Sequence, residues 1–62
     1  FAYASVVSIR PISAGEQLTA DNLWVKRPGT GEILAAEYED MLGRTATTDI
    51  PADTALRRAD VR

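Results

Sequence analysis

The chain has 62 residues, of which 45% are hydrophobic. A chain of this length forms one small domain at most, and it buries only about 60% of the surface that its unfolded form exposes. It contains no cysteine and no histidine, which excludes disulfides and ordinary zinc sites. Seven basic and nine acidic residues are interspersed, so no basic stripe is available to follow a nucleic-acid backbone.

The sequence also bears on where the protein works. Its apolar runs are only a few residues long, too short to span a membrane, and no signal peptide or targeting motif is visible. The absence of cysteine fits a cytoplasmic origin. Because the chain begins at Phe1 rather than at Met, we expect residues 1–62 to be a single domain cut from a longer protein.

The N-terminal segment has the pattern of a strand followed by a tight turn. Residues 5–9 are largely β-branched and apolar, which predicts a strand. Pro11 cannot donate to a β-ladder, so this strand should end at an edge or a bend. Residues 13–16 have the composition of a turn, in which Gly15 is expected to take a positive φ.

Next comes one helical turn and a second extended segment. Residues 19–23 predict a single helical turn with Thr19 as its N-cap. Residues 24–27 return to an extended conformation. In a chain this small, we expect the large side chain of Trp24 to be part of the core, although an exposed aromatic residue would suit an interface.

A short helix is predicted over residues 35–42, and Gly43 is well placed to end it in a left-handed cap. Its carboxylates are expected on the solvent side, because polar helix faces are the norm. The stripe predicted to be apolar consists of Leu34, Tyr38, Met41 and Leu42, and the carboxylates opposite are Glu37, Glu39 and Asp40.

The end of the chain repeats its beginning. Residues 45–50 are again strand-like, and residues 51–54 again form a turn. Isoleucine, alanine and leucine coincide at a constant offset, which predicts a pseudo-twofold fold of two interleaved halves, mainly β with short helical turns. The aligned segments are Ile12-Ser13-Ala14-Gly15-Glu16-Gln17-Leu18 with Ile50-Pro51-Ala52-Asp53-Thr54-Ala55-Leu56, and Asn22-Leu23 with Asp60-Val61.

Two motifs resemble a known family. Residues 5–23, with the run Ile12-Ser13-Ala14-Gly15-Glu16-Gln17-Leu18, resemble the opening of the SAF or antifreeze-like domain. Residues 25–31, Val-Lys-Arg-Pro-Gly-Thr-Gly, followed by Met41-Leu42-Gly43-Arg44, are similar to bacterial sialic acid synthases. The resemblance implies a β-clip fold, as in type III antifreeze proteins, and a C-terminal position in the parent enzyme.

The resemblance also implies an activity for that parent. Its TIM barrel would condense phosphoenolpyruvate with N-acetylmannosamine or a related sugar, using a divalent metal. The family forms domain-swapped homodimers in which the antifreeze-like domain caps the partner subunit's active site. An arginine just before the first strand reaches the sugar in that family, but Tyr3 and Ala4 stand there in this sequence.

No catalytic or metal-binding residues are expected within the domain itself. The Arg27–Pro28 step followed by two glycines makes the strongest loop, with three readings: an anion-binding nest, a simple chain reversal, or part of a surface docked against the barrel. Its candidate residues are Lys26, Arg27, Gly29, Thr30 and Gly31.

The sequence therefore predicts a non-catalytic lid or docking domain, with neither nucleic acid nor membrane among its partners. The alternative is a free-standing carbohydrate- or ice-binding module. Ice binding fits poorly, since Glu16, Gln17 and Asp21 would lie on the corresponding face. An antifreeze-like domain from another pathway is a third possibility, against which residues 26–31 argue.

Overall fold

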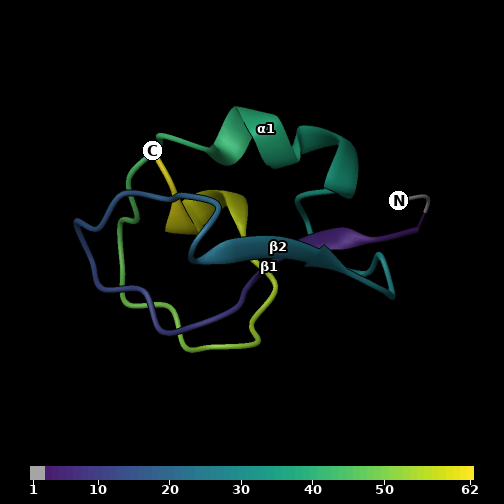
Figure 1. Ribbon diagram of the computed structural model, residues 1–62, viewed down its shortest axis with the longest axis horizontal. Coiled ribbons are helices and arrows are strands. Elements are labelled where there is room, and N and C mark those ends of the chain that lie inside the picture. Colours follow the sequence, from purple (N-terminus) through teal and green to yellow (C-terminus); the bar gives the residue numbers. More distant parts are fainter. Residues whose placement is uncertain (1–2) are drawn as a thin grey trace.

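A computed structural model describes residues 3–62, which form extended chain with short helical turns (Figure 1). The two strands, β1 (Ser5–Ser8) and β2 (Leu23–Lys26), pair in antiparallel register. The 3-10 turn η1 (Ala35–Glu37) runs directly into α1 (Tyr38–Met41), and a second 3-10 turn, η2 (Arg58–Asp60), precedes the C-terminus. Figure 1 shows α1 above the β1–β2 ribbon, with most of the connecting loops on the other side.

The predicted internal symmetry is confirmed by the backbone hydrogen bonds. Ile12 and Ile50, which are 38 positions apart, each donate an amide N–H to the other's carbonyl oxygen at 2.8 and 2.7 Å. Other bonds recur at the same offset, so a pseudo-twofold axis passes close to this isoleucine pair. The matching donor–acceptor pairs are Gly15–Ala46 with Asp53–Ser8, Leu18–Arg44 with Leu56–Val6, and Ala46–Glu16 with Ser8–Thr54.

The turns repeat with the symmetry as well. Gly15 has a φ of 88°, as predicted, and its counterpart Asp53 has a φ of 54°. Both residues sit in the left-handed region, where glycine is favoured and Asp is tolerated better than most residues. Gly43, with a φ of 89°, follows α1 as the sequence predicts.

In each half, a buried polar side chain accepts a hydrogen bond from the backbone amide three residues before it, at the start of the helical turn. The amide of Thr19 donates to Oδ1 of Asn22 at 2.9 Å, and the amide of Arg57 donates to Oδ2 of Asp60 at 3.0 Å. Thr19 also caps its turn as predicted, since its Oγ1 accepts from the amide of Asp21. Asn22 and Asp60 are both buried and both have hydrogen-bond partners, as buried polar groups require.

Two predictions of secondary structure need correction. The helix expected over residues 35–42 is divided into η1 and α1, and of its predicted apolar stripe only Met41 is buried, whereas Leu34 and Leu42 are exposed. A 3-10 turn has three residues per turn rather than 3.6, so a four-residue spacing does not keep one face. Residues 45–50 form isolated bridges rather than a strand.

The core lies between the two halves and draws on both. Most of its members are aliphatic side chains from β1, β2 and the connecting segments, and both Leu18 and its symmetry counterpart Leu56 belong to it. Met41 is the contribution of α1. The cluster consists of Ala4, Val6, Ile12, Leu18, Leu23, Val25, Ile33, Met41, Ala46, Ile50 and Leu56.

Candidate functional site

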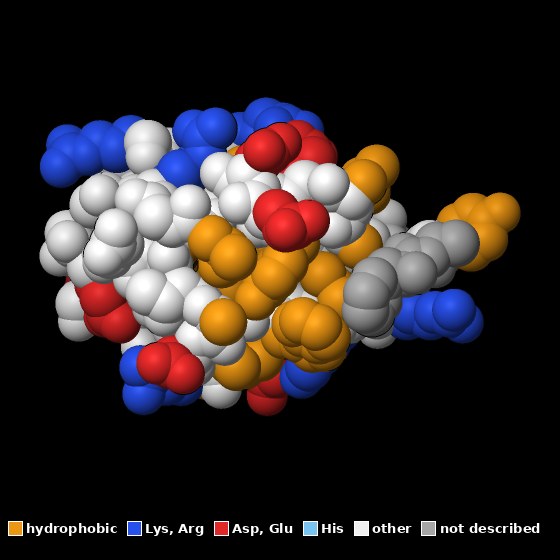
Figure 2. Space-filling model, turned by 45° about the horizontal axis from the view of Figure 1, so that its top comes forward, with side chains coloured by type: hydrophobic (Ala, Val, Ile, Leu, Met, Phe, Trp, Pro, Cys, Tyr) orange, Lys and Arg blue, Asp and Glu red, His pale blue; other side chains and the backbone are white. Residues whose placement is uncertain are grey.

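An open apolar groove of about 480 Å³ lies between β2 and the segment formed by η1 and α1. Figure 2 shows hydrophobic side chains gathered in one patch on the face that carries α1. Five of the lining side chains are aliphatic, two are aromatic and one is charged. The lining residues are Ala20, Trp24, Val25, Ala35, Ala36, Tyr38, Glu39 and Leu42. We call this feature the Trp24 groove.

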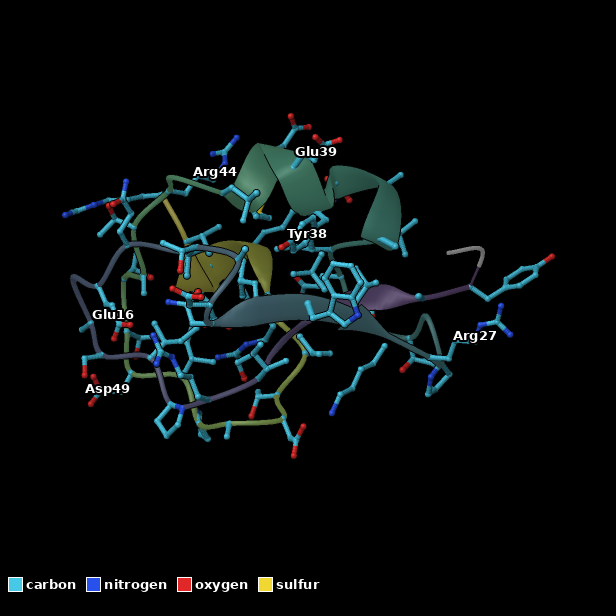
Figure 3. All side chains as sticks on the ribbon, in the orientation of Figure 1. Glu16, Arg27, Tyr38, Glu39, Arg44 and Asp49 are labelled. Atoms are coloured by element: carbon cyan, nitrogen blue, oxygen red, sulfur yellow. The ribbon has the colours of Figure 1, made fainter. Side chains whose placement is uncertain are left out.

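The pleat of β2 places the indole in the groove. Side chains alternate along a strand, so Leu23 and Val25 point into the core while Trp24 and Lys26 point out. Tyr38 approaches from α1, and the two aromatic rings meet edge to face, with centroids 5.4 Å apart and planes at 84° (Figure 3). Such a pair holds both rings in fixed orientations.

The prediction that Trp24 belongs to the core is wrong, because 46% of its surface is exposed. The sequence contains the necessary signal, since Leu23 and Val25 flank Trp24 and cannot share its face of a strand. Size alone favoured burial, but the two-residue period decides the side. The Trp24 groove is therefore a site that sequence reasoning missed.

Glu39 is the single carboxylate among the groove-lining residues, and its neighbour Glu37 is directed elsewhere. Glu37 forms a two-pronged ion pair with the guanidinium of Arg58, with both N–O distances at 3.0 Å. The hydrogen bond from Arg58 and then the backbone amide of Leu34 lower the pKa of Glu37, and the same pairing raises the pKa of Arg58. This ion pair links η1 to η2. The carboxylate that lines the groove is therefore that of Glu39 and not that of Glu37.

The loop that follows β2 packs against the start of the chain. The Arg27–Pro28 peptide bond is cis, and the Pro28 carbonyl accepts a hydrogen bond from Oγ of Ser5 at 3.3 Å. A Cβ added to Gly29 would lie 2.5 Å from the carbonyl carbon of Tyr3. Residue 29 must therefore be glycine for the loop to approach the backbone so closely.

The other candidate residues of the loop fall into two groups. Gly31 also lies in close contact, since an added Cβ would be 3.0 Å from Oγ of Ser5. Lys26 forms an ion pair with Asp53, whereas Arg27 and Thr30 are exposed. Neither Gly29 nor Gly31 has a positive φ, so close packing, rather than left-handed backbone, accounts for both glycines.

The position where the resembling family has an arginine is occupied by two very different residues. Tyr3 is 86% exposed, while Ala4 is buried and accepts a hydrogen bond from the amide of Ala35. Arg27 emerges from the loop that packs on this segment, and Figure 3 shows it at the end of the molecule away from Glu16 and Asp49. The structure thus places an arginine near the start of β1, although not at the family's position.

Within residues 3–62, no group of three histidine, cysteine, aspartate or glutamate side chains is arranged to hold a metal ion. The described helices are all too short to cross a membrane.

Comparison with known proteins gives the same match by sequence and by structure. The family model of the SAF domain matches residues 3–62. The chain is 38% identical over 64 residues to the spore coat polysaccharide biosynthesis protein SpsE of Bacillus subtilis (strain 168), covering 98% of this chain and 17% of that protein. The crystal structure of the same Bacillus subtilis protein superposes with a TM-score of 0.82 at 37% identity, covering 100% of this chain and 18% of that one. The chain thus spans less than a fifth of the relative that it matches.

Proposed function

Because this chain belongs to the SAF domain family, we propose that it is the non-catalytic, C-terminal docking domain of a sialic acid synthase-like enzyme of polysaccharide biosynthesis. The observation that carries this proposal is the coverage of the match, which takes in nearly all of this chain but only 17% of a polysaccharide biosynthesis protein. A domain of this kind works through the larger protein around it. Its exposed features, an apolar groove and a rigid loop, suit contact rather than chemistry.

In this proposal the domain caps the active site of a partner subunit in a homodimer. The parent would condense phosphoenolpyruvate with N-acetylmannosamine or a related sugar in the cytoplasm, with its divalent metal held by the barrel. Closing such a site excludes water and positions the substrate. The tight packing of Gly29 on Tyr3 supports the idea, because a cap must hold its shape.

The docking reading of the loop is favoured over the anion-binding nest. Lys26, the cation beside the loop, is paired with Asp53, and the two glycines serve close packing. Arg27 is exposed, and we assign it the contact with the sugar that the resembling family makes through a different position. Its exposure at the end of the domain where β1 begins supports this role.

The test compares the full-length protein with a variant that lacks residues 3–62. We expect kcat/KM for sugar condensation to fall by about a hundredfold, since misplacing a substrate by about 1 Å has an effect of that size. Unchanged activity in the deleted protein would refute the capping role. Turnover of phosphoenolpyruvate by the 62-residue chain alone would refute the claim that the domain is non-catalytic.

A carbohydrate-binding module is the second candidate, and the exposed Trp24 beside Glu39 is the observation in its favour. Sugar recognition needs several polar groups aimed at hydroxyls, and most of the lining is hydrocarbon. Calorimetric titration of the chain with N-acetylmannosamine distinguishes the two. Heat that saturates at one site per chain would favour the carbohydrate module.

A further inference from the structure

The Trp24 groove belongs to the part of the fold that the internal symmetry does not repeat. The offset that relates Ile12 to Ile50 relates residues 5–24 to residues 43–62. Among residues 3–62, no second helical segment corresponds to η1 and α1 at this offset. The symmetry partner of Trp24 is Arg62, an exposed residue that pairs with Thr45 just as Trp24 pairs with Val7. The two-halves fold thus does not itself require an aromatic side chain at position 24.

The groove has the composition of a protein–protein contact. Exposed aromatic side chains held in one conformation lose little entropy on binding, and they dominate the binding energy of interfaces. Trp24 meets this condition through its edge-to-face contact with the partly buried Tyr38. Leu42, 37% exposed, extends the apolar surface beside them.

The charges around the groove indicate the chemistry of the partner. Glu39 lines the groove, and Asp21 follows the groove residue Ala20; both carboxylates are exposed, and none of the ion pairs formed by the described residues includes either of them. By contrast, Lys26 and Arg58 already have carboxylate partners. A ligand with a positive charge beside its apolar group would complement this surface.

We propose that the Trp24 groove binds a protein segment in which a large apolar side chain is flanked by lysine or arginine. The apolar side chain rests on Trp24 and Leu42, and the cation pairs with Glu39 within reach of the indole face, where a cation–π contact adds to the attraction. This inference rests on the proposed function, because we expect the bound segment to belong to the part of the full-length protein outside this domain.

A second copy of this chain fits the groove less well. A twofold contact through this surface would bring Glu39 of one copy toward Glu39 of the other over an apolar patch, and like charges that lose solvent repel strongly. A sugar is disfavoured by the hydrocarbon lining. A second copy is a distinguishable result of the crosslinking experiment below, and the calorimetric titration with N-acetylmannosamine tests the sugar.

The first experiment identifies the occupant by photocrosslinking in the full-length protein. The photoreactive residue p-benzoylphenylalanine replaces Ala36 in the groove, and a control protein carries it at Ile9, an exposed apolar position outside the groove. We expect crosslinks from position 36 to a peptide outside residues 3–62 that contains an apolar residue next to Lys or Arg. Crosslinks confined to a second copy of this domain, to a peptide without a basic residue, or equal to those from position 9 would overturn the proposal.

A charge reversal tests the electrostatic part. Glu39→Lys in the full-length protein should increase the hydrogen-exchange rate of residues 35–42 about tenfold or more, which corresponds to about 1.4 kcal/mol of lost docking energy. Asp40→Lys, one position outside the groove lining, should have no such effect. Equal exchange in both variants would contradict the proposal. If deletion of residues 3–62 abolishes activity while Glu39→Lys changes nothing, the docking function stands and this groove is not its surface.

Discussion

The indole of Trp24 and the phenol ring of Tyr38 meet nearly at right angles across the groove, one from β2 and the other from α1. Fourteen positions separate them in sequence, and α1 reaches the strand through residues that the internal symmetry does not include. This contact therefore joins the symmetric body of the fold to its unrepeated segment. Its exposure makes it more valuable for binding than for stability.

Removing the indole should cost little stability. Trp24→Ala in the 62-residue chain is expected to lower the free energy of unfolding by about 1 kcal/mol, the worth of an aromatic pair. Leu23→Ala, one position earlier in the buried core, should cost about 2–5 kcal/mol. Urea denaturation followed by circular dichroism measures both. A loss at Trp24 as large as that at Leu23 would show that the indole belongs to the core after all.

Gly29 should tolerate no side chain. A Cβ at this position would overlap the backbone of Tyr3, which can move only if the loop moves with it. We expect Gly29→Ala to destabilise the domain by about 1–3 kcal/mol, as overpacking does. Thr30→Ala, at an exposed neighbouring position, is the control and should be nearly neutral. Equal thermal midpoints for the two variants would contradict the close approach.

The ion pair between Glu37 and Arg58 should make stability depend on acid pH. The folded-state pKa of Glu37 is depressed by Arg58, so its contribution is fully present above the unfolded value of about 4.3. The contribution is lost as the pH falls through the lower, folded value. Glu16 adds a similar dependence, since its pKa is lowered by the amide of Ser13 and then by Asn22.

Glu37→Gln should therefore flatten the loss of stability below pH 5, without removing the part that Glu16 contributes. Urea titrations at several pH values between about 3 and 7 measure this slope. Arg44→Met serves as the control, because Arg44 donates to the backbone carbonyl of Asp40 and contacts neither carboxylate. The account is wrong on this point if the glutamine variant keeps the slope of the unmodified chain.

Arg27 should affect substrate binding in the full-length enzyme. Arg27→Ala is expected to raise KM for the sugar about tenfold, the effect of losing a charge-assisted hydrogen bond of about 1.5 kcal/mol. Arg27→Lys should restore part of that loss. Arg10→Ala, an exposed arginine outside the loop, is the matched control. Identical kinetics for the two alanine variants would remove Arg27 from the site.

Much of the fold can be predicted from the turn-forming residues and from the internal repeat of the sequence. The positive φ of Gly15 and Gly43 follows from glycine's freedom at turns and helix ends, and the repeat predicts that Ile12 and Ile50 are equivalent. These features depend on neighbours within a few residues or on a simple offset. The direct pairing of Ile12 with Ile50 is shown only by the structure.

The candidate site was harder to predict because it depends on distant segments. The alternation with Leu23 and Val25 gives the side of β2 on which Trp24 lies. Its contact with Tyr38 depends on the position of α1, which no local pattern gives. For Gly29 and Gly31 the sequence left an anion-binding nest, a chain reversal and a docking surface open, whereas the structure shows close contact of these glycines with Tyr3 and Ser5 from the start of the chain.

The most direct test of the central claim is the binding of the separate 62-residue chain to the full-length protein from which residues 3–62 have been deleted. We predict saturable binding by calorimetry, with recovery of the condensation activity on addition of the domain and weaker binding by the Trp24→Ala variant. Absence of both binding and recovery, with a chain that unfolds cooperatively, would contradict the account that this domain acts by docking onto the rest of its protein.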